Sequence, residues 1–348
     1  MALPGVNIAF ANGLIGTVAP QEDGVSAILL SAVELNPVVI YSSDDTHIPV
    51  SAANIVKAFY AEAGEGAELW LGGGGDDAEE ALAGAKALIK AANGRIRTML
   101  MSGYTTSIIP NAAPSIRTYS LAVNAPVIVI AAFGTPASVA AATAISGHGD
   151  GVVALAEVAH EPVLLGRLAR IPVERHIGRV RDGALYGITS TPAILSDVSP
   201  TADTNGYVTV RKHIGRDGYF FTEDHTATAA TDDYHSIARR RTADKAYRIA
   251  YDTLLTYVND NLPVNNDGTL TASAAKAIEQ TLITAIYNGM TAEGNLSVDD
   301  TDSSDKGVKA VVDTTNDFVA TSKLNVTLSI KPYGYAKYID VTLGFLKE

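Results

Sequence analysis

The sequence contains no cysteine, which excludes a disulfide framework and any metal site built on thiolates. Basic residues are also scarce relative to acidic ones. The formal net charge is −12 and the isoelectric point is about 5.0. A protein that wraps duplex nucleic acid needs a basic surface, so this balance argues against that role. We expect no nucleic-acid partner.

The chain also lacks an uninterrupted apolar run long enough for a membrane span. Residues 118–149 contain no Asp, Glu, Lys or Arg, but Asn124, Pro126 and Gly134 interrupt them. A transmembrane helix needs about 20 consecutive apolar residues. The pattern instead predicts a buried strand at 127–132 and an alanine-rich helix from Ala137, and no membrane insertion. The opening residues lack the basic region and the long apolar core of a signal peptide.

Sequence patterns for catalysis on phosphate ligands are incomplete. Gly72–Gly75 follow a predicted strand and precede a predicted helix, as a phosphate-binding loop would. Such a loop ends in Lys and Ser or Thr, whereas Asp76 and Asp77 follow here, and two carboxylates repel a phosphate. A flexible turn is therefore the favoured interpretation. An α/β enzyme that binds a phosphate ligand at these glycines is retained as the rival of another functional class.

Patterns for metal binding and nucleophilic catalysis are weak as well. His225 and His235 have the right chemistry for metal ligands, but the spacing is not compact and the segment between them is typical of a loop. The carboxylates near them are Glu223, Asp224, Asp232 and Asp233. No Gly-x-Ser-x-Gly elbow presents a serine. We therefore predict no catalytic residue, no metal site, no cofactor and no enzymatic activity.

The segment 21–190 alternates between strand and helix patterns. The predicted strands are residues 25–30, 38–41, 68–71, 97–101, 127–132 and 152–155. Helices are predicted at 51–63, with Ser51 as the N-cap, and from Asp76 or Asp77 through Ile89. Repeated βα units favour a largely parallel sheet between layers of helices. This segment is predicted to be an α/β middle domain.

The C-terminal part has an α+β pattern. Strand-like residues at 207–211 and 218–222 precede a long helix from Asp244 to about Asn261. A second helix is expected from Ala272 to Asn288, with Gly289 as its C-terminal cap, and an acidic loop at 299–305 follows. We predict a C-terminal core at 191–335, flanked by an N-terminal arm at 1–20 and a C-terminal arm at 336–348.

Both ends of the chain show the period-2 alternation of a pleated strand with one apolar face. The apolar positions are Val6, Ile8 and Phe10 at the start, Leu324, Val326, Leu328 and Ile330 near the end, and Ile339, Val341, Leu343 and Phe345 in the last residues. Chain ends are usually polar and frayed. We therefore predict that both termini are strands that pair with the sheets of neighbouring copies.

Two clusters of basic residues stand out in this acidic chain. Arg239, Arg240 and Arg241 lie just before the helix predicted at Asp244. They are interpreted either as a solvated helix entry or as a patch that contacts an acidic partner or organises carboxylates within the domain. The second cluster lies in the stretch LLGRLARIPVERHIGRVRDG and consists of Arg167, Arg170, Arg175, Arg179 and Arg181. It is interpreted either as an ion-pairing surface or as a set of local salt bridges.

The C-terminal region resembles the sheath proteins of contractile phage tails and related contractile injection systems. The resemblance rests on the run DGYFFTEDHTATAATDDYHSIARRRTADKAYRIAYDTLLTYVNDNL, on the second helix and acidic loop, and on LNVTLSIKPYGYAKYIDVTLGFLKE as a terminal strand pair. The segments MALPGVNIAFANGLIG and GRLARIPVERHIGRVRDGALYGI resemble the arm and middle domain of a divergent group associated with phage-like elements of Bacteroidetes.

This resemblance implies a structural role. Sheath subunits form stacked hexameric rings around an inner tube and exchange terminal strands with their neighbours. On triggering, the sheath contracts and drives the tube through a target envelope. The implied partners are other copies of the chain, the tube protein, and baseplate and terminator proteins. The implied location is a virion tail or phage-like particle assembled in the bacterial cytoplasm.

Within this interpretation, the tube contact is expected on the helix 272–288 and the loop after it. Lys306 and Lys309 are the candidates to face an acidic tube. Two other rivals remain open at this point: the sheath of a type VI-like or extracellular injection system, and a soluble shell or adhesin protein with swapped strands.

Overall fold

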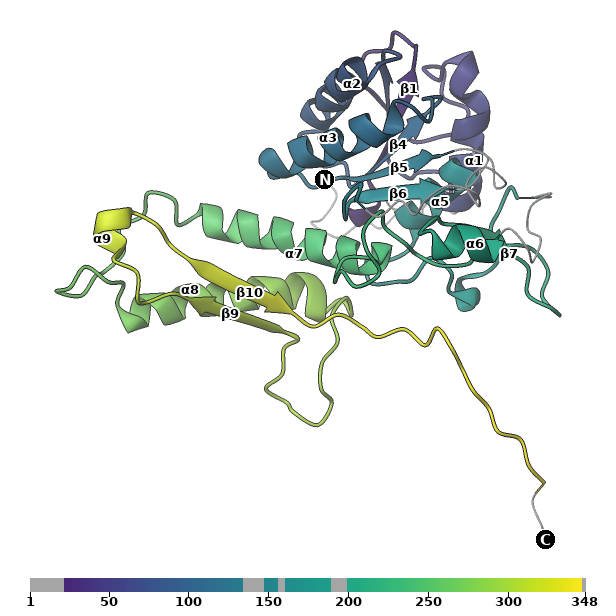
Figure 1. The fold of residues 1–348 in the computed structure, drawn as a ribbon. Helices are drawn as coiled ribbons and strands as arrows, with labels where there is room; N and C mark the ends of the chain where they lie inside the picture. Colours follow the sequence, from purple (N-terminus) through teal and green to yellow (C-terminus); the bar gives the residue numbers. More distant parts are fainter. Residues whose placement is uncertain (1–21, 134–146, 156–159, 189–198, 346–348) are drawn as a thin grey trace, which may run out of the picture.

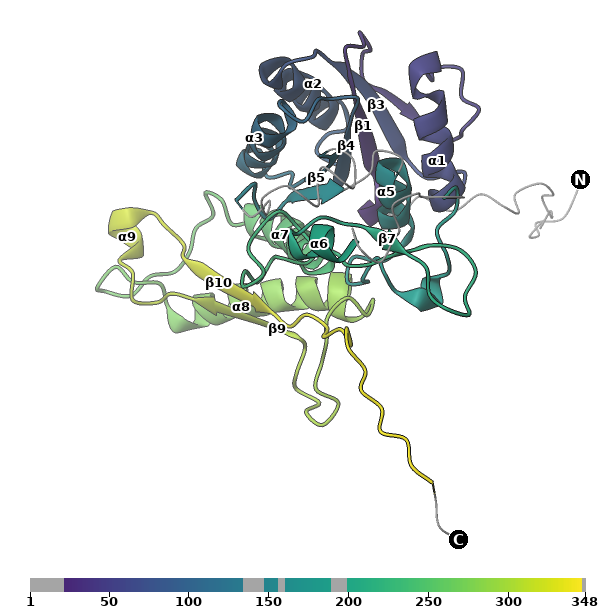
Figure 2. The ribbon, with the colours of Figure 1, turned by 45° about the vertical axis from the view of Figure 1, so that its right-hand side comes forward.

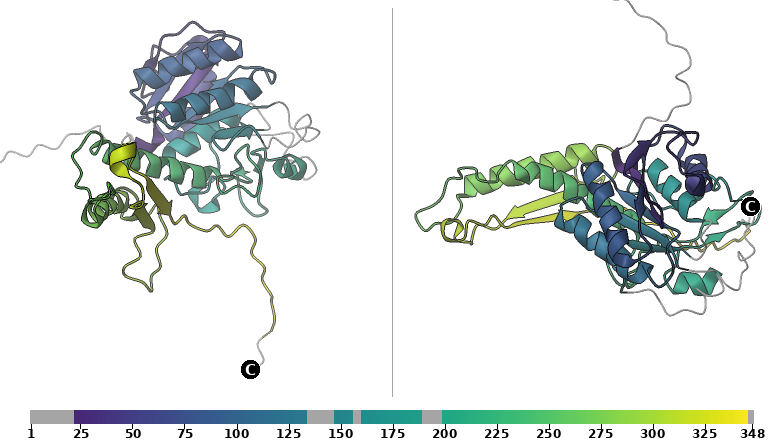
Figure 3. Two further views of the ribbon diagram at one scale, coloured as in Figure 1. Left: turned by 60° about the vertical axis from the view of Figure 1, so that its left-hand side comes forward. Right: turned by 90° about the horizontal axis from the view of Figure 1, so that it is seen from above.

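The structure is a computed structural model that describes residues 22–133, 147–155, 160–188 and 199–345. Two parts are visible in Figure 1. One is a sheet covered by helices, and the other is a pair of long helices with a β-hairpin. The right-hand view of Figure 3 shows that the helix pair and the hairpin extend away from the sheet. Among the described residues, no helix is both long and apolar enough to cross a bilayer.

The first part is built on a six-stranded sheet in the order β2-β3-β1-β4-β5-β6. The strands are β1 (Ser26–Ser31), β2 (Val38–Ile40), β3 (Leu69–Gly74), β4 (Thr98–Ser102), β5 (Ile128–Ala132) and β6 (Val152–Leu155). All neighbours pair in parallel except β2, which is antiparallel to β3. The prediction of a largely parallel sheet is therefore confirmed, and the short edge strand β2 is its exception.

Helices cover both faces of this sheet, as Figure 2 shows. One face packs against α2 (Ala78–Ala91) and α3 (Ile109–Ala122), and the other against α1 (Ala53–Ala63) and α5 (Glu161–Arg170). Because both faces are covered, the central strands are buried along almost their whole length. This explains why they read as continuous apolar runs rather than as alternating ones.

Two of these helices, α3 and α5, are not evident from the sequence. Helix α3 begins with Pro110 near its start and contains Pro114, which weakens a helix prediction. Nearly all of α5 is buried, including the charged Arg167, so it has no polar face to reveal a helical period. Arg167 and Arg170 contact the buried Glu62 of α1, which makes this part of the second basic cluster a set of local bridges.

One of the predicted helix starts is wrong, and another is confirmed. Ser51 is not an N-cap, because α1 continues directly from a 3₁₀ turn over Val50–Ala52. Asp77 does cap α2, and its carboxylate accepts a hydrogen bond of 2.8 Å from the Glu80 amide. The helix predicted from Ala137 lies outside the described residues.

Residues after the predicted boundary at 190 also pack on the sheet. The short elements there are α6 (Ser199–Thr204), β7 (Val210–Arg211) and β8 (Phe220–Phe221). Val208, Val210 and Phe221 belong to the hydrophobic core that covers the α1 and α5 face. The α/β part therefore takes in side chains well beyond residue 190.

The second part of the structure contains the two long helices. They are α7 (Ile237–Leu255) and α8 (Ala272–Ile286). Helix α7 begins at Ile237 rather than at Asp244, because Ser236 caps it by accepting a hydrogen bond from the Arg239 amide. Gly289 does not end α8: a π-helical turn over Tyr287–Thr291 continues it, and Gly289 lies close to Ile249 of α7.

The hairpin on these helices pairs β9 (Val308–Val312) with β10 (Val326–Ile330) in antiparallel register, with Leu328 opposite Ala310. The strand expected at residues 339–345 is not formed within the single chain, and its pairing with a neighbouring copy stays a prediction. Residues 339–345 form no strand and extend away from the hairpin (Figure 1). The small helix α9 (Phe318–Thr321) lies in the connection between the two strands.

Arginines at the start of α7 join the two parts. Arg240 contacts Asp150 before β6 at 2.6 Å and Asp244 on its own helix at 2.9 Å. Asp244 also receives two hydrogen bonds from Arg117 of α3, at 3.0 and 3.1 Å. Arg241 donates to the carbonyls of Leu168 and Ile171 at the end of α5. The arginine run therefore lies inside α7, not before a helix, and two of its members bind within the molecule.

We expect Asp244→Asn to destabilise the chain. The side chain of Asp244 is only 4% exposed, and its removal as a charge leaves Arg117 and Arg240 with the half-buried Asp150 as their remaining carboxylate. Breaking a buried ion pair by changing one partner costs ~3–5 kcal/mol. Urea unfolding followed by circular dichroism measures the effect. Asp252→Asn, at an exposed position of the same helix, is the control; equal stability of the two variants would contradict the assignment.

Candidate assembly site

The C-terminal tail presents an apolar strand sequence to solvent. Leu343 is 93% exposed and Phe345 is 105% exposed, values found for free side chains. The exposed apolar residues of the tail are Tyr338, Ile339, Val341, Leu343 and Phe345. Contiguous apolar exposure of this kind marks an interaction site. The corresponding N-terminal residues Val6, Ile8 and Phe10 lie outside the described residues.

The hairpin has one apolar face on the helices and one polar face. Val326, Leu328 and Ile330 of β10 alternate with exposed Thr327 and Ser329. The apolar side chains pack on a cluster formed by α7, α8 and β9. They remain only half-buried, as does Leu324, which lies just before the strand. The apolar face of β10 is thus incompletely covered within one chain.

The hydrogen-bond pattern shows which backbone groups of β10 point outward. Asp313 donates to the Asn325 carbonyl at 2.9 Å, and Lys331 donates to the Gly307 carbonyl at 2.8 Å. Antiparallel pairs alternate between bonded and non-bonded positions. The amides and carbonyls of Val326, Leu328 and Ile330 therefore point away from β9. They form an open edge that a further strand can join.

The outer edge of β9 is different. The amide of Val312 donates to the carboxylate of Glu279 on α8 at 3.0 Å, so a side chain already occupies this position. Lys276 contacts the same carboxylate at 2.5 Å. Strand β9 begins where the loop after α8 was expected to continue, and no strand was predicted at 308–312. Because Glu279 already occupies the outer edge of β9, the outer edge of β10 is the more open of the two.

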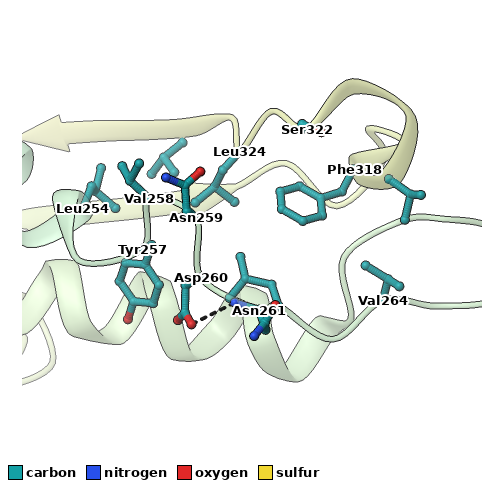
Figure 4. A pocket seen from close by; sticks show the side chains of 13 residues that line it. Leu254, Tyr257, Val258, Asn259, Asp260, Asn261, Val264, Phe318, Ser322 and Leu324 are labelled. Atoms are coloured by element: carbon teal, nitrogen blue, oxygen red, sulfur yellow. Dashed lines mark hydrogen bonds between the residues drawn. The ribbon is translucent and has the colours of Figure 1, made fainter.

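A hollow of about 860 Å³, lined by both polar and apolar residues, lies at the start of β10. Figure 4 shows that it is bounded by the end of α7, the loop after it, and α9. Its apolar lining includes Leu254, Val258, Phe318, Leu324 and Val326. The sequence gives no sign of this hollow, because its walls come from two segments far apart in the chain, 254–264 and 318–326. It provides apolar surface beside the open edge of β10.

The two lysines that were candidates for a tube contact lie at the hairpin. Lys309 is on the exposed face of β9. The ammonium of Lys306 lies 5.7 Å from the centre of the Tyr287 ring, a cation–π contact. A tube contact through Lys306 and Lys309 stays a prediction.

The glycine run has a packing explanation. A side-chain carbon at Gly72 would collide with Leu88 of α2, and one at Gly73 with the backbone of Val33. Gly74 and Gly75 similarly lack room, since Tyr104 and Glu80 lie against them. The glycines therefore allow close approach of neighbouring groups, and the observed contacts give no support to a phosphate cradle.

The candidate metal ligands are not brought together. His225 contacts Asp203 at 3.2 Å, and Nδ1 of His235 lies 2.6 Å from the carbonyl of Asp232. Within the described residues, the group with three close ligand atoms is His176, Glu223 and Asp224. Both nitrogens of His176 are engaged, since Nδ1 accepts from the Gly178 amide and Nε2 lies 3.1 Å from Asp224. We assign no metal to it.

Comparison with known families gives two adjacent matches. Residues 3–225 match the family described as DUF2586, N-terminal domain, and residues 233–348 match DUF2586, C-terminal domain. The junction between these matches lies shortly before α7, later than the boundary predicted at 190. No curated protein matches the chain.

Solved structures with a similar fold come from contractile particles. The helical sheath of the anti-feeding prophage in its contracted state aligns with a TM-score of 0.69 at 15% identity, over 99% of both chains. The contracted sheath complex of PVC, an extracellular contractile injection system, aligns with a TM-score of 0.63 at 12% identity, over 99% of this chain and 98% of the other. A chain of the anti-feeding prophage baseplate also aligns over 99% of both chains, with a TM-score of 0.63 at 13% identity. The fold of this chain is therefore that of sheath proteins.

We expect limited chymotrypsin digestion of the unpolymerised chain to remove the tail first. Cleavage after Tyr338, Leu343 or Phe345 needs no unfolding, because these residues are exposed and their segment has no regular structure. Mass spectrometry of the fragments identifies the cut sites, and the remaining body should keep its melting temperature. Cleavage within the buried core before the tail would contradict the exposure described above.

Proposed function

Because the chain belongs to the DUF2586 family and has the fold of contractile sheath proteins, we propose that it is a sheath subunit and not an enzyme. The similarity supports this proposal because it extends over 99% of the chain, including both the sheet and the helix pair. In the proposed particle, copies form stacked hexameric rings around an inner tube, and contraction drives the tube through an envelope. Baseplate and terminator proteins would bound the stack, and assembly would take place in the bacterial cytoplasm.

One observation carries the proposal: the same chain exposes an apolar strand sequence and an open strand edge. In the tail, exposed Ile339, Val341 and Leu343 alternate with Asp340 and Thr342, and β10 has outward backbone groups at Val326, Leu328 and Ile330. Addition of an extended segment to a sheet edge provides main-chain hydrogen bonds, and alternate side chains provide specificity. A second copy of the chain supplies the missing partner for each.

In the proposed exchange, the tail of one copy lies beside β10 of another. Its apolar side chains would cover the half-buried Leu328 and Ile330, and Phe345 would approach the hollow at Leu254 and Phe318. Val6, Ile8 and Phe10 are proposed to pair with a neighbouring copy in the same way. Because strand pairing is local, it can persist while whole subunits rotate relative to one another during contraction.

The energy of one exchange is modest. Burial of an apolar side chain contributes about 1.5–3 kcal/mol, whereas ordering the backbone costs roughly 1–2 kcal/mol per residue. These terms nearly cancel for a short tail. Repetition in a lattice, where each copy both donates and accepts, makes the assembly stable through effective concentration. Stability of the proposed sheath therefore depends on many weak, identical contacts.

One alternative is that the particle is an extracellular injection system rather than a phage tail. The likeness to the PVC sheath favours it, since that protein comes from an extracellular contractile injection system. This alternative keeps the same subunit role and the same strand exchange. It differs only in the particle that carries the sheath.

We expect the double variant Val341→Asp/Leu343→Asp to abolish polymers while leaving the monomer folded. Placing carboxylates against the apolar face of β10 should lower the polymerised fraction by more than about tenfold. Sedimentation and negative-stain electron microscopy measure polymer, and thermal unfolding checks the fold. Thr342→Asp adds a charge on the other side of the tail and serves as the matched control. Equal polymerisation of both variants would refute the role of the apolar side.

The choice of edge is testable because the chain has no cysteine of its own. In assembled particles, Ser329→Cys on β10 combined with Thr342→Cys should give intermolecular disulfides under mild oxidation. Lys309→Cys on β9 with Thr342→Cys should not, because the strands are then two positions, about 9.6 Å, apart, which exceeds disulfide reach. Non-reducing electrophoresis separates the products. Crosslinking at Lys309 alone would place the incoming strand on β9.

A further inference from the structure

The tail is fixed to the α/β part before its exposed segment begins. The hydroxyl of Tyr335 donates to the Glu174 carbonyl at 2.7 Å, and its ring packs edge-on against His176 at 5.5 Å. The ammonium of Lys337 contacts Glu223 at 2.6 Å. We call these contacts the clamp, formed by Tyr335 and Lys337 of the tail and by the Glu174 carbonyl, His176, Glu223 and Asp224 of the body.

The body side of the clamp is held in place by its own contacts. Nδ1 of His176 accepts the Gly178 amide at 3.0 Å, so Nε2 carries the proton that Asp224 accepts at 3.1 Å. Asp224 is buried, and its other oxygen accepts from the Ser236 hydroxyl at the start of α7. Burial alone would raise the pKa of Glu223, but hydrogen bonds from His176 and Lys337 lower it to about 2. Glu223 is therefore ionised, and its contact with Lys337 is a charge-assisted hydrogen bond.

A hairpin between β10 and the tail of the same chain is the closed alternative to strand exchange. Pro332 and Gly334 lie between two apolar alternating segments, an arrangement typical of a hairpin. A hairpin that aligns Leu328 with Leu343 also places Ile330 opposite Val341 and Val326 opposite Phe345. Because the two segments belong to one chain, their effective concentration is in the millimolar range. Self-pairing would occupy the β10 edge and the tail at once.

The structure shows the opposite arrangement. After Lys331 the chain crosses to the α/β part, and beyond Lys337 it runs away from the hairpin, as Figures 1 and 2 both show. Lys331 is itself fixed, since its backbone pairs with Gly307 and Ser297 and its ammonium contacts Asp305 at 2.9 Å. Tyr333 and Gly334 therefore lie between two fixed residues, Lys331 and Tyr335. Residues 338–345 are exposed and form no helix or strand.

We propose that the clamp positions the C-terminal strand away from the β10 edge of its own chain, so that both remain available to other copies. This inference rests on the proposed strand exchange. Tyr335 and Lys337 are positioning residues: they fix the point at which the tail leaves the body, and they do not lie in the exchanged strand. The clamp thereby prevents a closed monomer that would compete with assembly.

The test uses Ser329→Cys/Thr342→Cys in dilute, unpolymerised protein, where an intramolecular disulfide reports self-pairing. In the alignment above, Ser329 lies opposite Thr342 on the solvent side. With the clamp intact, little intramolecular disulfide is expected under mild oxidation. Adding Tyr335→Phe and Lys337→Met removes one hydrogen bond and one charge-assisted bond, and should raise the intramolecular fraction about tenfold. The same clamp variants without cysteines should polymerise less.

Matched variants separate the clamp from general effects. Tyr333→Phe changes a nearby tyrosine outside the clamp, and Lys337→Arg keeps the charge; both should retain the low intramolecular fraction. Thermal unfolding checks that Tyr335→Phe/Lys337→Met remains folded. An intramolecular fraction that is the same with and without the clamp, whether high or low, would overturn the proposal. Because this readout uses monomers, it tests the clamp even if the chain forms no sheath. Equal polymerisation of the clamp variants and the unchanged chain would contradict the clamp's role in assembly without contradicting strand exchange.

Discussion

The exposed apolar tail and the open edge of β10 each lack a partner within one chain, and the structure holds the two apart. A two-stranded hairpin is only marginally stable by itself, and here α7 and α8 cover one face of it while β10 keeps a free edge. The tail has the complementary chemistry but starts from the α/β part. This separation is the constraint from which the proposed assembly follows, because in that assembly another copy completes the sheet.

The hairpin can transmit force only if it is firmly joined to the rest of the subunit. The buried contacts of Asp244 with Arg117 and Arg240, and those of Arg241 with the end of α5, provide that connection. Rigid subunits joined by flexible exchanged strands fit a rotation of whole bodies during contraction. In this view the arginine run of α7, which the sequence offers as a partner surface, supports rigidity within the subunit.

Sequence periodicity identified the six strands of the large sheet and the α7–α8 pair, because alternation and helical stripes are local properties. It could not identify partners: β10 pairs with β9, at a position where no strand was predicted. Helix α5 was missed because burial on all sides removes the polar face, and α3 because of its prolines. The clamp and the hollow join residues far apart in the chain, such as Lys337 and Glu223, so no local pattern reveals them.

The most direct test of strand donation is an electron cryomicroscopy map of assembled particles at side-chain resolution. The account predicts that residues 339–345 of one copy lie beside Val326–Ile330 of a different copy, while Tyr335 and Lys337 of the donor stay on their own α/β part. A map in which each tail folds back onto the β10 strand of its own chain, in particles that are nevertheless assembled, would contradict it.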